Sequence, residues 1–225
     1  LEHFDLVELG HNSAEYIRVV SEAMKAATSD KDAHVGDPAF HSVPLERLTS
    51  KAYAAQLAQQ INRGERFHVD RIGMPEPKHT THVAVIDGEG NAVTMTHSLG
   101  MPSGVITDGL GFMYNGCMAV FDPRPGRAGS IAPGKARFSS LCPTLAFKDG
   151  QLRLAIGAPG GTQIAMGVTQ AIINVIDHDM SMTEAVSAPR FSSTSNLIDV
   201  TNRIPRYVQA ELEADGYQVF RKPNT

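Results

Sequence analysis

The sequence predicts a layered α+β fold, because segments with helical periodicity stand at both ends of the chain and strand-like segments fill its middle. Residues 1–70 favour helices, residues 80–156 contain two hairpin patterns, and the residues after 162 return to helical spacing. With 225 residues and 42% hydrophobic side chains, the chain is long enough for one sizeable core or two small ones.

Two helices are predicted in the N-terminal third. Asn12 with Glu15 matches a capping box, and apolar residues follow at helical spacing, namely Ile17, Val20, Met24 and Ala27. A second helix begins at about Ser50 and stops at Gly64, and its apolar stripe consists of Tyr53, Leu57 and Ile61.

The stretch 64–79 is polar and contains Pro75 and Pro77, so we expect an exposed, flexible linker. A strand-like alternation begins directly after it, at Thr80. The sequence therefore divides at this point into residues 1–79 and residues 80–225.

Two β-hairpins are predicted in the middle of the chain, because alternating segments flank turn residues at 87–90 and at 149–150. The stretch 98–137 between them is rich in Gly and Pro, and we expect loops around short strands there. The strand segments of the hairpins are residues 81–86 with 91–96, and residues 144–148 with 151–156.

Three further helices follow the second hairpin, and each begins at a residue that favours a helix start, namely Thr162, Ser181 and Pro205. The first has a wide apolar face, formed by Ile164, Val168, Ala171, Ile172 and Val175. The last carries Val208 and Leu212 and ends before Gly216.

The net charge of −4 is too small to indicate a nucleic-acid surface or an anionic membrane surface. No run of 18 apolar residues is present, so no membrane span is predicted in this chain. The sequence gives no signal for localisation, because it starts at Leu1 without a recognisable targeting segment and we expect it to be a piece of a longer protein.

The cysteines and histidines carry weak signals. Cys117 and Cys142 are compatible either with a disulfide or with two free thiols. His82 and His97 stand at a spacing that could place them face to face across a hairpin. No set of ligands with metal spacing accompanies them, so we predict structural histidines and assign neither a metal nor another cofactor.

Thr80 is the candidate nucleophile. A threonine hydroxyl needs a base to remove its proton, and cleavage of the His79–Thr80 bond would provide one in the new α-amine of Thr80 itself. Unperturbed α-amines titrate near pH 7.7–8.0, so a large fraction is neutral at physiological pH. The same hydroxyl can first cut the preceding bond through an ester. On spacing alone, a threonine that merely starts a strand is the commoner reading.

Two small groups of residues support an acyl-transfer site. Gly160 and Gly161 lie between a strand and a helix start, where backbone N–H groups can stabilise an oxyanion, although a plain strand-to-helix turn has the same pattern. Ser139 and Ser140 offer paired hydroxyls for a substrate carboxylate, although such pairs are also common in turns.

These residues belong to segments that, in this order, resemble the gamma-glutamyltransferase (gamma-glutamyltranspeptidase) family. Residues 80–93 resemble the start of the family's small subunit, and residues 36–38 and 51–54 resemble the end of its large subunit. The remaining matches are residues 139–144 with Ser-Ser-x-x-Pro-Thr, residues 157–161 with Gly-Ser-Pro-Gly-Gly, and residues 188–191 with Ala-Pro-Arg-Phe.

The resemblance implies an αββα sandwich of the N-terminal-nucleophile (Ntn) hydrolases, self-cleavage before Thr80, and cleavage of γ-glutamyl amides through an acyl-enzyme. By position, Thr80 matches the nucleophile and Ser98 a second threonine beside it. Gly160 and Gly161 match the oxyanion-hole glycines, and Ser139 with Ser140 matches the serines that hold the donor α-carboxylate.

The sequence departs from the family where the donor α-amino group is bound. An Asn, an acidic or amide residue, and an Asp serve there in the family, and the aligned residues here are Gly100, Cys117 and Val120. A buried ammonium without an anionic partner is costly. We therefore expect retained catalytic machinery with weakened or changed γ-glutamyl recognition.

The resemblance implies a heterodimer of large and small subunits or a higher oligomer, with the missing N-terminal half of the precursor as partner. A family arginine that pairs with the donor carboxylate would lie in that half. One alternative is an amidase similar to the cephalosporin and glutaryl acylases of the superfamily. Another is an uncleaved, non-catalytic homologue.

Overall fold

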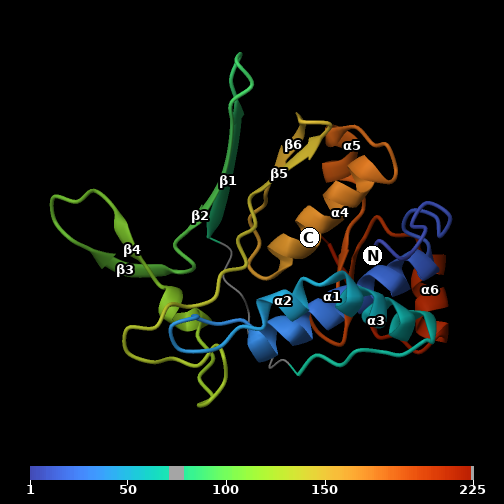
Figure 1. The fold of residues 1–225 in the computed structure, drawn as a ribbon, viewed down its shortest axis with the longest axis horizontal. Helices are drawn as coiled ribbons and strands as arrows, with labels where there is room; N and C mark the ends of the chain where they lie inside the picture. Colours follow the sequence, from blue (N-terminus) through green and yellow to red (C-terminus); the bar gives the residue numbers. More distant parts are fainter. Residues whose placement is uncertain (71–78, 224–225) are drawn as a thin grey trace. The chain divides into compact units, whose positions relative to one another are not determined.

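The computed structural model describes residues 1–70 and 79–223, and it confirms the predicted α+β class (Figure 1). The chain packs as two compact units, the first formed by residues 1–73 with 169–225 and the second by residues 74–168. The predicted division after residue 79 concerns cleavage of the chain rather than packing, and it stays a prediction. Within the described ranges, no helix has both the length and the apolar character to cross a membrane.

The first unit combines helices with a three-stranded sheet. Strand β7 pairs antiparallel with β8, and β8 pairs parallel with β9 through a crossover that contains α6. The elements are α1 (Ala14–His34), α2 (Leu45–Leu48), α3 (Lys51–Asn62), α5 (Met182–Ser187), β7 (Phe191–Ser192), β8 (Ile198–Thr201), α6 (Arg206–Ala214) and β9 (Val219–Lys222). Helix α4 (Gln163–Ile176) begins in the second unit and ends in the first.

Helix α1 supplies much of the core of the first unit. Of its predicted stripe, Ile17, Val20 and Met24 are buried as expected. The expectation for Ala27 is wrong: it is exposed, and Thr28 is buried in its place. The reason is geometric, because at 3.6 residues per turn position 27 falls at the edge of the stripe and position 28 nearer its centre.

The predicted cap of α1 is also wrong. Ser13 is the N-cap, and its Oγ accepts the backbone N–H of Tyr16 at 3.0 Å. Asn12 instead adopts a positive φ of 59° and donates from Nδ2 to the Pro189 carbonyl at 2.9 Å. The tertiary contact at Asn12 moves the helix start by one residue.

Two of the other predicted helix starts are confirmed. Ser50 caps α3, and Ser181 with Glu184 forms the capping box of α5. Pro205 is the N-cap of α6 rather than a residue of its first turn, because α6 begins at Arg206. Both predicted core residues of this helix are fully buried, Val208 at 1% and Leu212 at 0% exposure.

The second unit contains three antiparallel hairpins, and both predicted ones are confirmed. Asp149 and Gly150 both have positive φ, at 53° and 76°, as a tight hairpin turn requires. The elements are β1 (Thr80–Ile86), β2 (Ala92–Ser98), β3 (Pro102–Ile106), β4 (Met113–Asn115), the 3₁₀ helix η1 (Cys117–Val120), β5 (Thr144–Lys148) and β6 (Gln151–Ile156).

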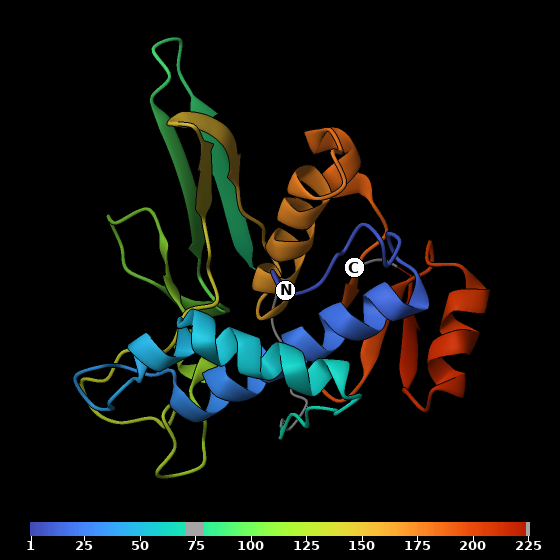
Figure 2. The ribbon, with the colours of Figure 1, turned by 45° about the vertical axis from the view of Figure 1, so that its right-hand side comes forward.

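The β1–β2 hairpin has two different faces. On one face, Val83 pairs with Met95 and Val85 with Val93, and these four side chains are 43–59% exposed. The other face carries His82, and the β5–β6 hairpin runs alongside β1–β2 (Figure 2). The exposed face is unusually apolar for a surface that only water covers.

Core packing in the first unit leads to a stability prediction. Leu212→Ala should lower the free energy of unfolding by about 2–5 kcal/mol, because it leaves a cavity at a fully buried position. Urea denaturation checks this, with Leu45→Ala as the control, since Leu45 is 64% exposed and should change stability by less than about 0.5 kcal/mol. Equal effects of the two substitutions would contradict this packing.

Candidate active site

Thr80 and Ser98 face each other at the open end of the β1–β2 hairpin. They are cross-strand partners, and the Thr80 hydroxyl donates to Ser98 Oγ at 2.9 Å. The Ser98 hydroxyl in turn donates to the His79 carbonyl at 3.0 Å and accepts the Gly100 N–H at 2.9 Å. A chain of hydrogen bonds therefore joins the candidate nucleophile to the carbonyl of the peptide bond that precedes it.

The two histidines do not face each other, and that expectation is wrong. His82 pairs with Thr96, whereas His97 pairs with Thr81. The offset of one residue puts the two rings on opposite faces of the hairpin, because side chains alternate along a strand. Within residues 1–70 and 79–223, no group of three or more His, Cys, Asp or Glu side chains could hold a metal ion.

His82 lies at the centre of a polar network. Its Nδ1 is 2.8 Å from Thr96 Oγ1, and its Nε2 is 3.2 Å from Thr94 Oγ1. Thr94 also donates to the carbonyl of Ile156, at the end of β6, over 3.3 Å. The network ties the strand that carries Ser98 to the strand that leads into the glycine-rich loop. The sequence reasoning did not identify the two threonines, although their alternation on one strand face was visible.

The glycine-rich loop of residues 157–161 joins β6 to α4. A Cβ atom at Gly157 would lie 2.3 Å from Cε1 of the His82 ring, so only glycine fits at this contact. Gly160 and Gly161 follow at the N-terminal side of α4 and have positive φ values of 141° and 63°. Glycine adopts these values without steric cost, which leaves the backbone free to turn into the helix.

The two candidate serines differ in their contacts. Ser140 Oγ donates to the Gly161 carbonyl at 2.9 Å, so Ser140 is held against the glycine-rich loop. Ser139 is more exposed, and its Oγ accepts the N–H of Leu141 at 3.2 Å. The structure thus brings Ser140 together with Gly161, whereas Ser139 makes a local contact.

Gly100 and Cys117 are in contact, although they are far apart in the sequence. A Cβ at Gly100 would lie 2.8 Å from Cys117 Sγ, and Gly100 has a positive φ of 66°. Cys117 opens η1, which ends at Val120. Cys117 and Cys142 are both free thiols, and burial raises the pKa of the Cys142 thiol.

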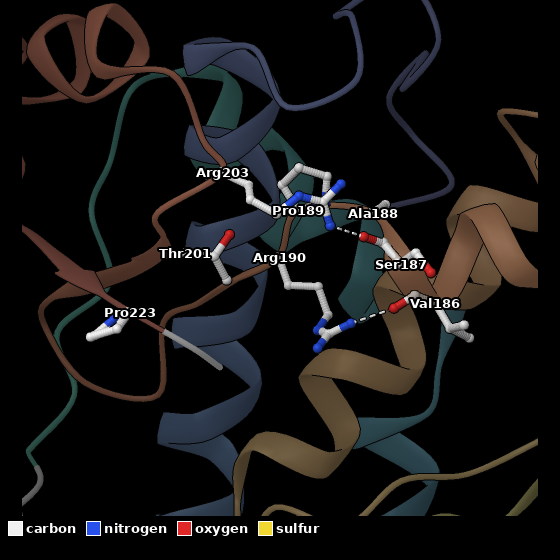
Figure 3. A pocket seen from close by; sticks show the side chains of 8 residues that line it. All are labelled: Val186, Ser187, Ala188, Pro189, Arg190, Thr201, Arg203 and Pro223. Carbon is white, nitrogen blue, oxygen red and sulfur yellow. Dashed lines mark hydrogen bonds between the residues drawn. The ribbon is translucent and has the colours of Figure 1, made fainter.

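A separate pocket of about 300 Å³ lies in the first unit, and no residue pattern predicted it. Arg190 and Arg203 reach along its wall and donate to the carbonyls of Val186 and Ser187 at the end of α5 (Figure 3). The pocket also includes Ala188, Pro189, Thr201 and Pro223. All of its lining residues belong to the first unit, whereas every candidate catalytic residue belongs to the second.

The fold is that of the Ntn hydrolases, as the family resemblance implied. The chain is similar to a cephalosporin acylase from Bacillus halodurans, with a TM-score of 0.79 and 25% identity, over 94% of this chain and 39% of that one. It is also similar to the T380A mutant of Helicobacter pylori gamma-glutamyltranspeptidase, with a TM-score of 0.60 and 36% identity, over 64% of this chain and 86% of that one.

The family profile described as gamma-glutamyltranspeptidase matches residues 1–225, so the chain belongs to this family. An acylase ACY 1 proenzyme from Pseudomonas sp. (strain V22) is 40% identical over 99% of this chain, and the glutathione hydrolase proenzyme of Escherichia coli (strain K12) is 35% identical over 85% of it. The chain spans 40% of the length of the first relative and 36% of the second.

The contact between Gly157 and His82 leads to a second prediction. Gly157→Ala should lower the free energy of unfolding by about 1–3 kcal/mol, because the new methyl group collides with the His82 ring. Thermal unfolding measures this. In the His82→Ala background, Gly157→Ala should lower the free energy of unfolding by clearly less, since the His82 ring is no longer there to collide with the methyl group.

Gly167→Ala is the matched control. Gly167 lies in α4, and nothing stands within 4 Å of the place that an alanine Cβ would occupy, so alanine there should raise stability by about 0.5–1 kcal/mol. A stabilising effect of Gly157→Ala would contradict the contact.

Proposed function

We propose that the protein is a self-processing Ntn hydrolase that cuts its own chain between His79 and Thr80 and then cleaves acyl amides through an acyl-enzyme on Thr80. The observation that carries the proposal is the Ser98 hydroxyl, which lies 2.9 Å from the Thr80 hydroxyl and 3.0 Å from the His79 carbonyl oxygen. One side chain therefore touches both the attacking group and the bond to be broken.

Self-cleavage follows from this arrangement. The Thr80 hydroxyl attacks the His79 carbonyl carbon, a new C–O bond forms, and the C–N bond breaks. Ser98 accepts the Thr80 proton as it passes its own proton to the His79 carbonyl oxygen, and that proton moves to the departing Thr80 nitrogen when the C–N bond breaks and the carbonyl re-forms. Water then hydrolyses the ester, which leaves a carboxylate on His79 and a free α-amine and hydroxyl on Thr80.

Turnover of an amide repeats the same chemistry on a substrate. The Thr80 α-amine takes the hydroxyl proton, the oxygen attacks the acyl carbon, and the amine product leaves with that proton. The N–H groups of Gly160 and Gly161, at the start of α4, are suited to stabilise the oxyanion. Water or an acceptor amine then releases the acyl group, giving hydrolysis or transfer.

The proposed substrate is an acyl amide whose acyl group carries a carboxylate but needs no α-ammonium site. Ser139 and Ser140 are the candidate ligands of the carboxylate. Gly100 and Cys117 stand at the positions of polar residues that bind the α-amino group in the family, and the two are in contact, although neither side chain carries a carboxylate or an amide. The 40% identity to an acylase ACY 1 proenzyme favours this class. γ-Glutamyl compounds, including glutathione, are the alternative, supported by the glutathione hydrolase relatives.

The proposed partner is the remainder of the same precursor. After cleavage, residues 1–79 would end the larger polypeptide, and residues 80–225 would belong to the smaller one. The exposed apolar face of β1–β2 supports a partner, because valine and methionine side chains at 43–59% exposure favour burial against another polypeptide. In a heterodimer, or in a higher oligomer built from it, the partner polypeptide would bury this apolar face of β1–β2.

Self-cleavage is the third prediction. In the full-length protein, Thr80→Ala should leave an uncut precursor, whereas Thr80→Ser should still be cut, because it keeps the hydroxyl. Ser98→Ala should slow cleavage by about 100-fold through loss of the proton relay. Intact mass over time and N-terminal sequencing measure this. A Thr80→Ala protein that still matured and turned over an amide would refute the proposed nucleophile.

Substrate choice is the fourth prediction. The mature enzyme should have a higher kcat/KM for a glutaryl anilide than for the matching γ-glutamyl anilide, because the two differ only in the α-ammonium that Gly100 and Cys117 do not bind. Both anilides release the same chromophore, which makes the comparison direct. Comparable turnover of the two compounds would rule out an altered amino-group site.

A further inference from the structure

Residues 66–69, which end ten residues before the proposed cut, are held within the first unit by several side chains. Residues 66–69, which we call the strap, were expected to belong to an exposed linker, and part of that expectation is wrong. Val69 is only 2% exposed, and hydrogen bonds hold the strap at three of its four positions through the backbone. Residues 71–78 of the expected linker lie outside the described residues.

Two of these contacts come from the same polypeptide as the strap. Glu22 Oε2 accepts the N–H of Phe67 at 2.7 Å, and Ser29 Oγ donates to the carbonyl of His68 at 2.7 Å. Glu22 is fully buried and its other oxygen pairs with Lys25 Nζ at 2.9 Å. These bonds fix the strap along helix α1.

The remaining contacts join the strap to residues beyond the proposed cut. Asn196 accepts the Val69 N–H at 2.8 Å and donates to the Val69 carbonyl at 3.2 Å, so one amide side chain satisfies both backbone groups of a buried residue. Arg66 donates to the carbonyls of Asp215 and Gly216 at the C-terminal end of α6. Those carbonyls carry partial negative charge, which suits a guanidinium.

Tyr217 completes the attachment. The Arg66 guanidinium lies over its ring at 4.3 Å, and Lys25 Nζ lies over the same ring at 4.9 Å. Tyr217 is 7% exposed, and burial together with the negative charge of Glu22 raises its pKa to about 12. The buried ring thus makes cation–π contacts with both Arg66 and Lys25.

We propose that Asn196, Tyr217 and the α6 end form a docking surface that retains the strap, and with it the larger polypeptide, after the chain is cut at His79–Thr80. The inference rests on the proposed self-cleavage. Cleavage removes the covalent link between residues 1–73 and residues 169–225, which together form the first unit. The hydrogen bonds from the strap to Asn196, Asp215 and Gly216 then become bonds between two polypeptides. The Val69 backbone and the Arg66 guanidinium would then be the groups of the larger polypeptide that bind this surface.

The test uses the full-length protein with an affinity tag at its C-terminal end. After self-cleavage the protein is captured, washed at increasing urea concentrations, and the release rate of the larger polypeptide is followed by gel. Arg66→Ala and Asn196→Ala should each speed release by about three- to tenfold, and Arg66→Lys and Asn196→Asp should have smaller effects, because each keeps part of the contact. Tyr217→Leu should also speed release, because it removes the ring that lies under the Arg66 guanidinium.

Arg63→Ala is the matched control, because Arg63 pairs with Glu65 on the same polypeptide and should leave the release rate unchanged. A second arm separates this inference from the proposed function. Thr80→Ala protein receives a site for a specific protease within residues 74–77 and is cut by that protease, so no self-cleavage is needed.

If Arg66→Ala and Asn196→Ala speed release of the larger polypeptide in the protease-cut protein, while the wild type does not cut itself, the docking surface is supported and the proposed processing is refuted. If Arg66→Ala and Asn196→Ala release the larger polypeptide no faster than Arg63→Ala in the protease-cut protein, the docking surface is wrong, whatever the outcome for self-cleavage.

Discussion

The candidate site depends on the register of the β1–β2 hairpin, which places Ser98 directly opposite Thr80. A slip of one residue would turn every side chain to the other face and separate the two hydroxyls. The turn at the far end of the hairpin fixes the register. There Asp87 accepts the backbone N–H groups of Glu89 and Asn91, each at 2.9 Å, and the hydrogen bonds from Asn91 hold the pKa of Asp87 below its usual value. The hydrogen-bonded turn at one end of the hairpin thus sets how the hydroxyl groups of Thr80 and Ser98 are placed at the other end.

The glycine-rich loop depends on the same hairpin through a different contact. His82 occupies the space that a side chain at residue 157 would need, and Thr94 bonds the last residue of β6. The alternation of the strand puts His82 on the same face as Thr80, two residues away. The polar face of the hairpin therefore holds the candidate nucleophile at one point and the strand leading to Gly160 and Gly161 at another, whereas its apolar face supports the proposed contact with a partner polypeptide.

The first unit is built from segments that lie on both sides of Thr80 in the sequence. The first unit has a dense core in which α1, from the region before Thr80, packs with residues from the region after it, such as Leu212 and Phe191. In the proposed mature protein this core would be shared between two polypeptides, and packing would have to replace the lost peptide bond. The strap on Asn196 and Tyr217 fits such a role, because hydrogen bonds specify one position of the segment where hydrophobic contact alone would tolerate several.

The sequence by itself determined the fold class, both long hairpins and several helix starts, because alternation, turn residues and capping residues act over a few neighbouring positions. The residues that carry the proposed chemistry were identified through the resemblance to the gamma-glutamyltranspeptidase family, since spacing alone favoured a threonine that merely starts a strand. The sequence did not determine the Ser13 cap, the burial of Val69 or the opposite faces of His82 and His97. Only the tertiary structure decided that Ser98 touches both Thr80 and His79, that Cys117 lies against Gly100, and that the strap is bound. These contacts join residues distant in the chain, and their distances depend on register and packing, which no local pattern encodes.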